Sequence, residues 1–252
     1  MNDQIIEIAI SGGMGKMGQL VSEFIESKEG YKVSGIYDPG KQSNDFDNFE
    51  SIDEITADIL FEFSPANQIN KNLSQLMDKD INLIIGSSGL DPETINELES
   101  TISENQFICV IPNFSVGASL QKIISNIADQ NFKNVTIEER HHINKKDAPS
   151  GTAIDLANSL NTVNEESQED SSSDNYESNT VNNVHIKSIR GEEYIAEQTV
   201  TFTNSNESLT IDHVVNDRSA YLQGINYILD EHSSLKGFHH GLENIMIDRF
   251  KI

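Results

Sequence analysis

Basic residues are scarce in this sequence. Lys and Arg number 17 against 41 Asp and Glu, which gives a formal net charge of -24 at pH 7. An electrostatic field of this sign repels polyanions, so no nucleic acid and no anionic membrane surface is expected as a partner. A small anionic substrate is compatible with this charge, but it must be captured by positive groups that are placed locally.

Cysteine and long hydrophobic runs are also nearly missing. Cys109 is the sole cysteine, so no disulfide can form within the chain, and the sequence fits a reducing cytoplasm. No window approaches the roughly 20 apolar residues that span a bilayer. Residues 1–4 lack the basic charge that opens a signal peptide. We therefore expect a soluble, cytoplasmic protein.

The first half of the chain contains an alternation of strand and helix patterns. Helix-compatible segments separate short apolar runs at residues 5–10, 31–37, 59–61, 81–85 and 107–111. This order is typical of a parallel sheet with helices on both faces. It predicts a doubly wound α/β domain, and the 252 residues leave room for a second domain.

The pattern changes after a helix expected over 116–128. Four strand-like runs then follow, at residues 134–138, 184–189, 194–202 and 209–215. Little helix separates the last three of these runs. They favour an α+β domain with a mostly antiparallel mixed sheet. Residues 161–183, rich in Asn, Ser and acidic side chains, are expected to form a mobile solvated loop. The last segment, residues 219–229 and onward to 252, has helical apolar spacing and is expected to pack back onto the first domain.

A glycine-rich turn follows the first predicted strand. Gly12–Gly18 places small residues where a strand turns into a helix, so that backbone N–H groups can approach a pyrophosphate. Asp38 closes the second strand about 20 positions after Gly18, where a carboxylate accepts hydrogen bonds from a ribose. The pattern predicts a Rossmann-like dinucleotide site. The alternative is a tight turn beside an unrelated aspartate, and Lys16 is either a phosphate contact or a solvated lysine.

Two later segments also end predicted strands. They are Gly86–Gly89 and Pro112–Phe114, and ligands of open parallel sheets bind at such positions. Ordinary turns use the same residue types, so both interpretations stay open.

The densest cluster of reactive side chains spans residues 139–153. His141 and His142 offer the usual general acid near neutral pH, and Lys145 adds a positive charge and a second proton source. Ser150–Thr152 opens an expected helix, where N–H groups and hydroxyls form a carboxylate site. Neighbouring strand residues face opposite sides, so the two histidines share a site only if the chain is leaving the sheet. The alternative is a basic surface turn before a capped helix.

A family resemblance becomes specific at this cluster. The run His-His-x-x-Lys-x-Asp-x-Pro-Ser-Gly-Thr-Ala at 141–153 resembles the signature of the dihydrodipicolinate reductase family. The likeness extends, in the family's order, to Gly12–Gly18, Phe63-Ser64-Pro65, Gly86–Gly89 and Pro112–Gly117. It implies an oxidoreductase that uses NADH or NADPH to reduce 4-hydroxy-tetrahydrodipicolinate, via dihydrodipicolinate, to tetrahydrodipicolinate. This reaction belongs to lysine and diaminopimelate biosynthesis.

The resemblance also implies an organisation and a set of roles. Residues 1–114, completed by 217–252, would bind the dinucleotide, and residues 115–216 would bind a small dicarboxylate and build a homotetramer. His141 would be the acid/base residue and Lys145 the proton donor, with no metal involved. The substrate contacts would be His142, Ser150, Gly151 and Thr152. The cofactor contacts would be Gly12, Gly13, Met14, Gly15, Lys16, Met17, Asp38, Gly86, Ser87, Ser88, Ile111, Pro112, Asn113 and Phe114.

Departures from the family pattern and two alternatives accompany this hypothesis. The chain is short, Pro65 stands where the family has an arginine, and residues 161–183 are acidic where relatives carry Arg and Gly. Asp38 is followed by Pro39 and not by an arginine that would hold a 2′-phosphate, which predicts a preference for NADH. The alternatives are another two-domain dehydrogenase, of semialdehyde or homoserine type, and a catalytically silent dinucleotide sensor. The first is not expected to carry the 141–153 run, and the second is disfavoured because His141 and Lys145 are present.

Overall fold

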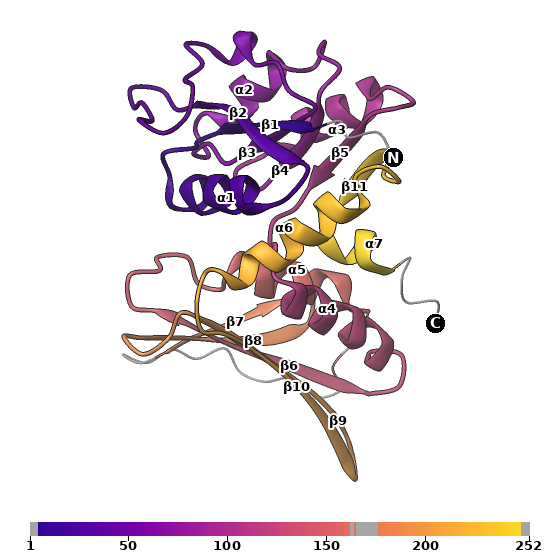
Figure 1. Ribbon diagram of the computed structural model, residues 1–252. Helices are drawn as coiled ribbons and strands as arrows, with labels where there is room; N and C mark the ends of the chain where they lie inside the picture. The colour runs from indigo at the N-terminus through magenta and orange to yellow at the C-terminus, as the bar shows by residue number, and fades with distance from the viewer. Residues whose placement is uncertain (1–4, 162–163, 165–175, 248–252) are drawn as a thin grey trace. The chain divides into compact units, whose positions relative to one another are not determined.

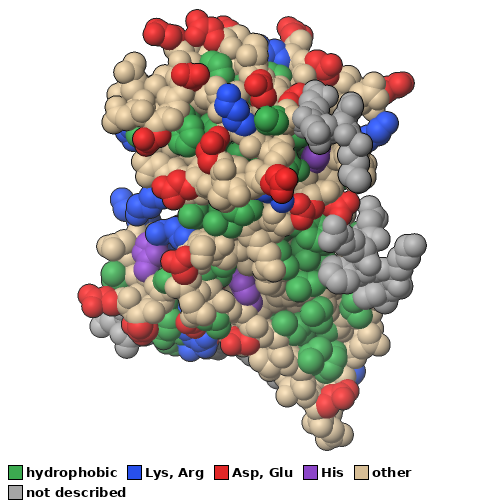
Figure 2. Space-filling view, viewed as in Figure 1, with side chains coloured by type: hydrophobic (Ala, Val, Ile, Leu, Met, Phe, Trp, Pro, Cys, Tyr) green, Lys and Arg blue, Asp and Glu red, His purple; other side chains and the backbone are tan. Residues whose placement is uncertain are grey.

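The computed structural model describes residues 5–161, 164 and 176–247, which form two compact units (Figure 1). Unit 1 contains residues 5–114 and 222–247 of this range, and unit 2 contains residues 115–221. No helix in the described range is long and apolar enough to cross a membrane. On the face shown in Figure 2, acidic side chains are scattered over unit 1 and basic ones are fewer.

Unit 1 is built on a six-stranded parallel sheet. Its strands, in the spatial order β11-β5-β4-β3-β1-β2, are β11 (Gly237–His240), β5 (Phe107–Val110), β4 (Asn82–Ile85), β3 (Ile59–Glu62), β1 (Ile6–Ser11) and β2 (Tyr31–Tyr37). The helical segments are α1 (Lys16–Ser27), η1 (Ile52–Glu54), α2 (Ile69–Ser74), α3 (Pro92–Thr101), α6 (Ala220–Glu231) and α7 (Leu242–Met246). The strand order reverses at β1, and ligands of such sheets bind beyond the carboxyl ends of the strands there. The predicted doubly wound α/β fold is confirmed.

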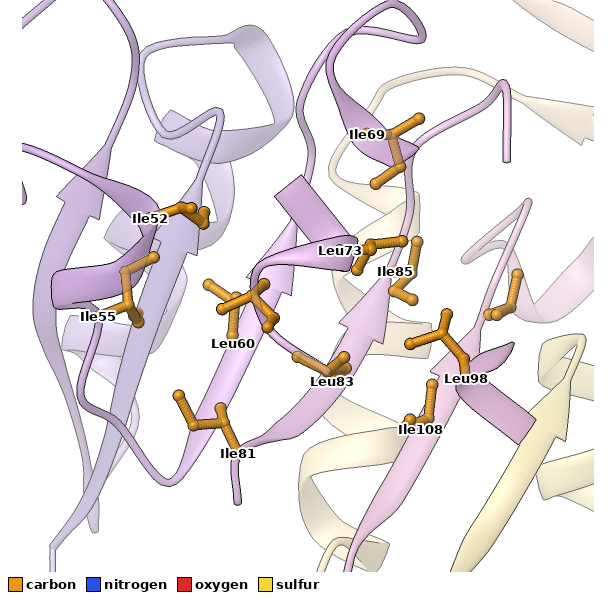
Figure 3. Close-up of a cluster of buried hydrophobic side chains, with 13 residues drawn as sticks. Ile52, Ile55, Leu60, Ile69, Leu73, Ile81, Leu83, Ile85, Leu98 and Ile108 are labelled. Carbon is orange, nitrogen blue, oxygen red and sulfur yellow. The ribbon is translucent and has the colours of Figure 1, made fainter. Parts of the chain in front are cut away.

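An aliphatic core holds this sheet in place. Side chains from η1, α2, α3 and strands β3 to β5 meet in one cluster, among them Ile52, Ile55, Leu60, Ile69, Leu73, Ile81, Leu83, Ile85, Leu98 and Ile108 (Figure 3). Every residue of β3 and β5 is buried, as is typical of parallel strands covered on both faces. Each buried Leu or Ile stabilises the unit by about 1.5–3 kcal/mol. The packed core therefore holds the carboxyl ends of the strands in fixed positions.

Unit 2 contains a five-stranded mixed sheet. In the spatial order β10-β9-β6-β8-β7, its strands are β10 (Glu207–Val215), β9 (Ala196–Asn204), β6 (Asn134–His142), β8 (Val184–Gly191) and β7 (Tyr176–Val181). The β6–β8 pair is parallel and the other pairs are antiparallel. Helices α4 (Val116–Ala128) and α5 (Gly151–Ser159) cover one face (Figure 1). The second predicted class, a mostly antiparallel mixed sheet with helices, is also confirmed.

Two expectations about unit 2 were wrong. Strand β6 continues to His142, four residues beyond its predicted end. Residues 176–181, expected to belong to a mobile loop, form strand β7 on the sheet edge, while residues 162–163 and 165–175 lie outside the described range. Asn182 and Asn183 have φ values of 48° and 62°, as in the two-residue turns that join antiparallel strands, and this turn pairs β7 with β8.

The C-terminal prediction was incomplete. The helix expected over 219–229 is α6, and the chain does return to the first sheet, but through β11, which pairs with β5. Neither β11 nor α7 was predicted. β11 has the sequence Gly-Phe-His-His, which contains a single apolar side chain and therefore no strand-like pattern.

Candidate active site

The glycine-rich turn of unit 1 is packed closely against its neighbours. Gly12 has a φ of +72°, and a Cβ there would lie 2.6 Å from the carbonyl carbon of Phe63. A Cβ at Gly18 would lie 2.5 Å from the Gly12 carbonyl oxygen. The Gly12 N–H donates to the Tyr37 carbonyl oxygen at 2.8 Å, which ties the turn to the end of β2. Glycine therefore lets β1, the turn and α1 pack in direct contact.

The start of α1 offers donors for an anion. Its N-cap residue, Gly15, gives the first turn no side-chain hydrogen bond, and both Gly15 and Lys16 are exposed. Backbone N–H groups in a first helical turn have no intrahelical partner and carry partial positive charge. Asp38 accepts a hydrogen bond from the Met14 N–H at 3.0 Å. The predicted phosphate-binding turn and the predicted ribose-binding carboxylate thus lie together, and these residues fit a dinucleotide.

The two other predicted cofactor segments follow β4 and β5: Gly86, Ser87 and Ser88, and Ile111, Pro112, Asn113 and Phe114. The Ile111 N–H donates to the Ile85 carbonyl oxygen at 2.8 Å. A Cβ at Gly86 would lie 2.6 Å from the rings of Phe63 and Phe114, which form an edge-to-face pair with centroids 6.0 Å apart. The segments after β3, β4 and β5 are therefore in contact at the carboxyl edge of the sheet.

In unit 2, His141 is held by a buried carboxylate. Its Nδ1 lies 2.5 Å from Oε2 of Glu139, two residues earlier on the same face of β6. The Glu139 side chain is 0% exposed and accepts hydrogen bonds from both terminal nitrogens of Arg190, each at 3.0 Å. It also accepts the backbone N–H of Ser150 at 3.2 Å. The strand, the start of α5 and the end of β8 are therefore joined at one carboxylate.

This network fixes the protonation pattern of the pair. Burial alone would raise the pKa of the Glu139 carboxyl, but hydrogen bonds from His141 and Arg190 outweigh it and hold the pKa at about 2. An ionised carboxylate only accepts hydrogen bonds, so Nδ1 of His141 carries the proton that faces it. Nε2 is then the ring nitrogen that can exchange a proton with a ligand.

Lys145 lies in the loop that joins β6 to α5. Its ammonium donates to Oδ2 of Asp147 at 2.6 Å. Partial burial would raise the pKa of Asp147, but the hydrogen bond from Lys145 lowers it. The Arg190 guanidinium donates to the carbonyl oxygens of Asp147 at 2.6 Å and of Lys145 at 3.4 Å. The arginine that pairs with Glu139 therefore also holds the loop that carries Lys145.

The predicted carboxylate site at the start of α5 is divided between internal and accessible groups. Ser150 is buried, its N–H bonds to Glu139, and its Oγ caps the helix by accepting the Ala153 N–H at 3.2 Å. Gly151 is exposed, with nothing within 4 Å of a Cβ placed there, and Thr152 is half-buried. Of these three residues, Gly151 and Thr152 are thus the ones that a ligand can reach.

The structure does not bring the two histidines to one face. Both lie within β6, where His141 pairs with Arg190 of β8 and His142 with Gly191. Because neighbouring strand residues alternate, the His142 side chain points to the face opposite His141. Its carbonyl oxygen accepts the Lys145 N–H at 3.0 Å, so His142 contacts the loop through its backbone.

Sequence reasoning missed two residues of this site, Glu139 and Arg190. One signal for Glu139 was available: Val135, Ile137 and Glu139 alternate at core-facing positions, and an acid in such a position requires a buried partner. No signal identified that partner, because Arg190 reaches Glu139 only through the parallel register of β6 and β8.

Known proteins match most of the chain. Models of the dihydrodipicolinate reductase N-terminus and C-terminus match residues 6–114 and 116–246. The 4-hydroxy-tetrahydrodipicolinate reductase of Cutibacterium acnes is 30% identical, with 88% of this chain and 90% of that protein covered. The enzyme of the same name from Carboxydothermus hydrogenoformans is also 30% identical, with 95% and 98% covered.

Solved structures share the fold. The dipicolinate-bound dihydrodipicolinate reductase from Paenisporosarcina sp. TG-14 has a TM-score of 0.81 at 23% identity, over 96% of this chain and 100% of that one. A myo-inositol dehydrogenase from Corynebacterium glutamicum has a TM-score of 0.63 at 16% identity, over 96% and 93%. At these identities the two structures support only the assignment of the fold.

The fold and the matches define an oxidoreductase that depends on NADH or NADPH. The chain belongs to the dihydrodipicolinate reductase family, whose related members are 4-hydroxy-tetrahydrodipicolinate reductases. Its activity is the reduction of 4-hydroxy-tetrahydrodipicolinate to tetrahydrodipicolinate, a step of lysine and diaminopimelate biosynthesis. The family and the activity predicted from residues 141–153 are therefore confirmed.

Proposed function

We propose that unit 1 binds the nicotinamide cofactor and that unit 2 binds the dicarboxylate and delivers the proton. The observation that carries this proposal is the buried Glu139 carboxylate, which orients His141 and is joined through Arg190 to the loop of Lys145. The Paenisporosarcina reductase holds dipicolinate, which supports a small dicarboxylate as the ligand here.

The cofactor would be held by the glycine-rich turn after β1, by the segments after β4 and β5, and by Asp38. Bound there, it supplies the hydride of the reduction. Asp38 would accept hydrogen bonds from the ribose hydroxyls and repel a 2′-phosphate, so we propose that NADH is preferred. Lys16, exposed at the start of α1, would lie near the phosphates.

Proton delivery falls to His141 and Lys145. Reduction of one ring double bond requires a hydride and a proton, and the Lys145 ammonium is a donor that Asp147 holds in place at 2.6 Å. The Glu139 carboxylate accepts the Nδ1 proton of His141 and so turns Nε2 towards a ligand, where this nitrogen would serve as the acid/base atom. These two groups would also assist the loss of water from the hydroxylated substrate.

The substrate carboxylates would meet the start of α5. The N–H groups of the first turn carry partial positive charge, and Gly151 and Thr152 can present them to a ligand. Ser150 would act by starting this helix, and His142 would act through its backbone, whose carbonyl oxygen accepts the Lys145 N–H at 3.0 Å. Local donors of this kind offset the repulsion between a dianion and a chain of net charge -24.

We further propose a cytoplasmic homotetramer whose subunits meet through unit 2. The sheet face opposite α4 and α5 carries half-buried side chains that include Thr136, Lys187, Thr199 and Thr201. A polar face of this kind suits contact with another copy of the chain. Light scattering after size exclusion would test it, since each chain weighs 28.1 kDa.

The assay that tests the function generates the substrate in place. Pyruvate and aspartate semialdehyde are condensed by the preceding enzyme of the pathway, and oxidation of NADH is followed by its absorbance. The proposal requires oxidation that depends on both precursors and on this protein. Oxidation that is unaffected by omission of either precursor would contradict it.

A further inference from the structure

Glu62 is a buried carboxyl group that the proposed mechanism does not use. It ends β3, in the interior of the parallel sheet, and its side chain is 0% exposed. Burial raises the pKa of this carboxyl, and hydrogen bonds from Ser64 and Asn72 lower it in part. Burial of an ionisable group away from any opposite charge costs free energy. The hydrogen bonds to Glu62 offset part of this cost and show what the carboxyl holds in place.

The groups that reach the Glu62 carboxyl oxygens within the described chain are uncharged. Oε1 accepts the Ser64 backbone N–H at 2.6 Å, and Oε2 accepts Nδ2 of Asn72 at 3.3 Å. The same Nδ2 donates to Ser64 Oγ at 2.9 Å, and this hydroxyl lies 2.9 Å from Ser11 Oγ. The carboxyl therefore fixes the peptide that leads out of β3 and ties it to α2 and to the end of β1.

That peptide rests on the glycine-rich turn. A Cβ at Gly12 would lie 2.6 Å from the carbonyl carbon and oxygen of Phe63 and 2.9 Å from the nitrogen of Ser64. The Phe63 N–H donates to the Ser11 carbonyl oxygen at 2.9 Å. Any displacement of the Phe63–Ser64 peptide is therefore passed directly to Gly12.

The backbone of Glu62 supports a second cofactor segment. Its carbonyl oxygen accepts the Gly86 N–H at 3.0 Å and the Ser87 hydroxyl at 3.1 Å. The Phe63 ring fills the space in front of Gly86, where a Cβ would be 2.6 Å away. Glu62 thus lies between the turn after β1 and the segment after β4.

We propose that Glu62 is a positioning residue for the cofactor. Its buried carboxyl holds the Phe63–Ser64 peptide against Gly12 and so sets the spacing between the glycine-rich turn and Gly86–Ser87. This inference rests on the proposed function, in which those segments bind NADH. Glu62 acts through Ser64 and Gly12, so its loss weakens cofactor binding and leaves the hydride and proton transfer groups in place.

The test compares NADH affinity across matched variants. Glu62→Leu removes both acceptors, and the NADH Kd, measured by fluorescence titration, is expected to rise on the order of tenfold, as for loss of a hydrogen bond of typical strength. The kcat at saturating NADH is expected to stay close to that of the wild type. Gln106→Leu is the control, since Gln106 is buried and donates to the Ile81 carbonyl oxygen at 2.5 Å, next to the amino end of β5.

A swapped pair gives a test that is independent of the Leu variant. Glu62→Gln turns an amide N–H towards Asn72, so the Asn72 amide must offer its Oδ1 and give up the contact of Nδ2 with Ser64 Oγ, which weakens binding. Adding Asn72→Asp restores one donor and one acceptor, so the double variant is expected to regain NADH affinity. Urea unfolding of the same variants separates the two roles, because a purely structural role predicts a loss of stability with an unchanged NADH Kd in the folded single variant.

Several results would overturn the inference. They are an unchanged NADH Kd in folded Glu62→Leu or Glu62→Gln, an equal loss of affinity in Gln106→Leu, or no recovery in the swapped pair. A wild-type protein that binds neither NADH nor NADPH would refute the proposed function together with this inference. Wild-type binding that the Glu62 variants leave unaltered would refute the inference alone.

Discussion

Replacement of Glu139 by glutamine separates the charge of this residue from its shape. The pKa of the carboxyl falls from its usual 4.5 to about 2 in the folded protein. At about 1.4 kcal/mol per pH unit, this difference stabilises the folded state by roughly 3 kcal/mol at pH 7. Because the folded pKa is the lower one, the contribution is complete above about pH 5 and is lost as the pH falls towards 2.

Glu139→Gln is therefore expected to be less stable than the wild type by about 3 kcal/mol at pH 7. The gap should narrow to roughly 1 kcal/mol by pH 3, where most unfolded carboxyls are protonated. Urea unfolding followed by circular dichroism, at one protein concentration, measures both values. A gap that is equal at the two pH values would refute the assignment of an ionised Glu139.

Glu138→Gln is the matched control for this experiment. Glu138 is the preceding residue of β6 and its side chain is 28% exposed, where it pairs with Arg140 and with Lys187. A partly exposed ion pair contributes less than about 1 kcal/mol. Equal losses in the free energy of unfolding for the two substitutions would show that the buried Glu139 contributes no more to stability than the partly exposed Glu138.

Three further predictions concern the cofactor, the substrate and the sole cysteine. The kcat/KM for NADH should exceed that for NADPH, and a tenfold preference for NADPH would contradict the role given to Asp38. In calorimetric titrations, pyridine-2,6-dicarboxylate should bind more tightly than a monocarboxylate. Thr152→Val should weaken the binding of the dicarboxylate by about 1.5–3 kcal/mol. Equal affinities for the two ligands, or for the wild type and the variant, would contradict a carboxylate site at the start of α5. Burial raises the pKa of Cys109 to about 12, so the thiol should resist iodoacetamide at pH 8 until urea unfolds the protein, and rapid labelling of the native protein would show that it is accessible.

The parts of the fold that follow local patterns were predictable from the sequence. Helix α4 spans Val116–Ala128 as expected, because Ser115 caps it and the apolar spacing is helical. The glycine-rich turn and Asp38 were found for the same reason, since a turn between a strand and a helix has its own sequence signature. Their contact, from Met14 to Asp38 at 3.0 Å, followed from that arrangement.

Features that depend on pairing between distant segments were not predictable. The end of β6 is set by its partners β8 and β9, so nothing in residues 139–142 alone indicated that both histidines lie in the strand. Strand β7 has few apolar side chains because it lies at the sheet edge, and its sequence therefore resembles a solvated loop. The partner of Glu139 lies in β8, and only the parallel pairing of β6 and β8 brings Arg190 to it.

The central claim is that His141 and Lys145 deliver the proton of the reduction. The most direct test is kcat at saturating substrate and NADH for His141→Gln and Lys145→Ala, with the substrate generated in place. Each variant is expected to lose roughly 10²–10⁴ in kcat, the range of general acid catalysis, while NADH Kd stays unchanged because both residues belong to unit 2. A kcat equal to that of the wild type in either variant would contradict the claim.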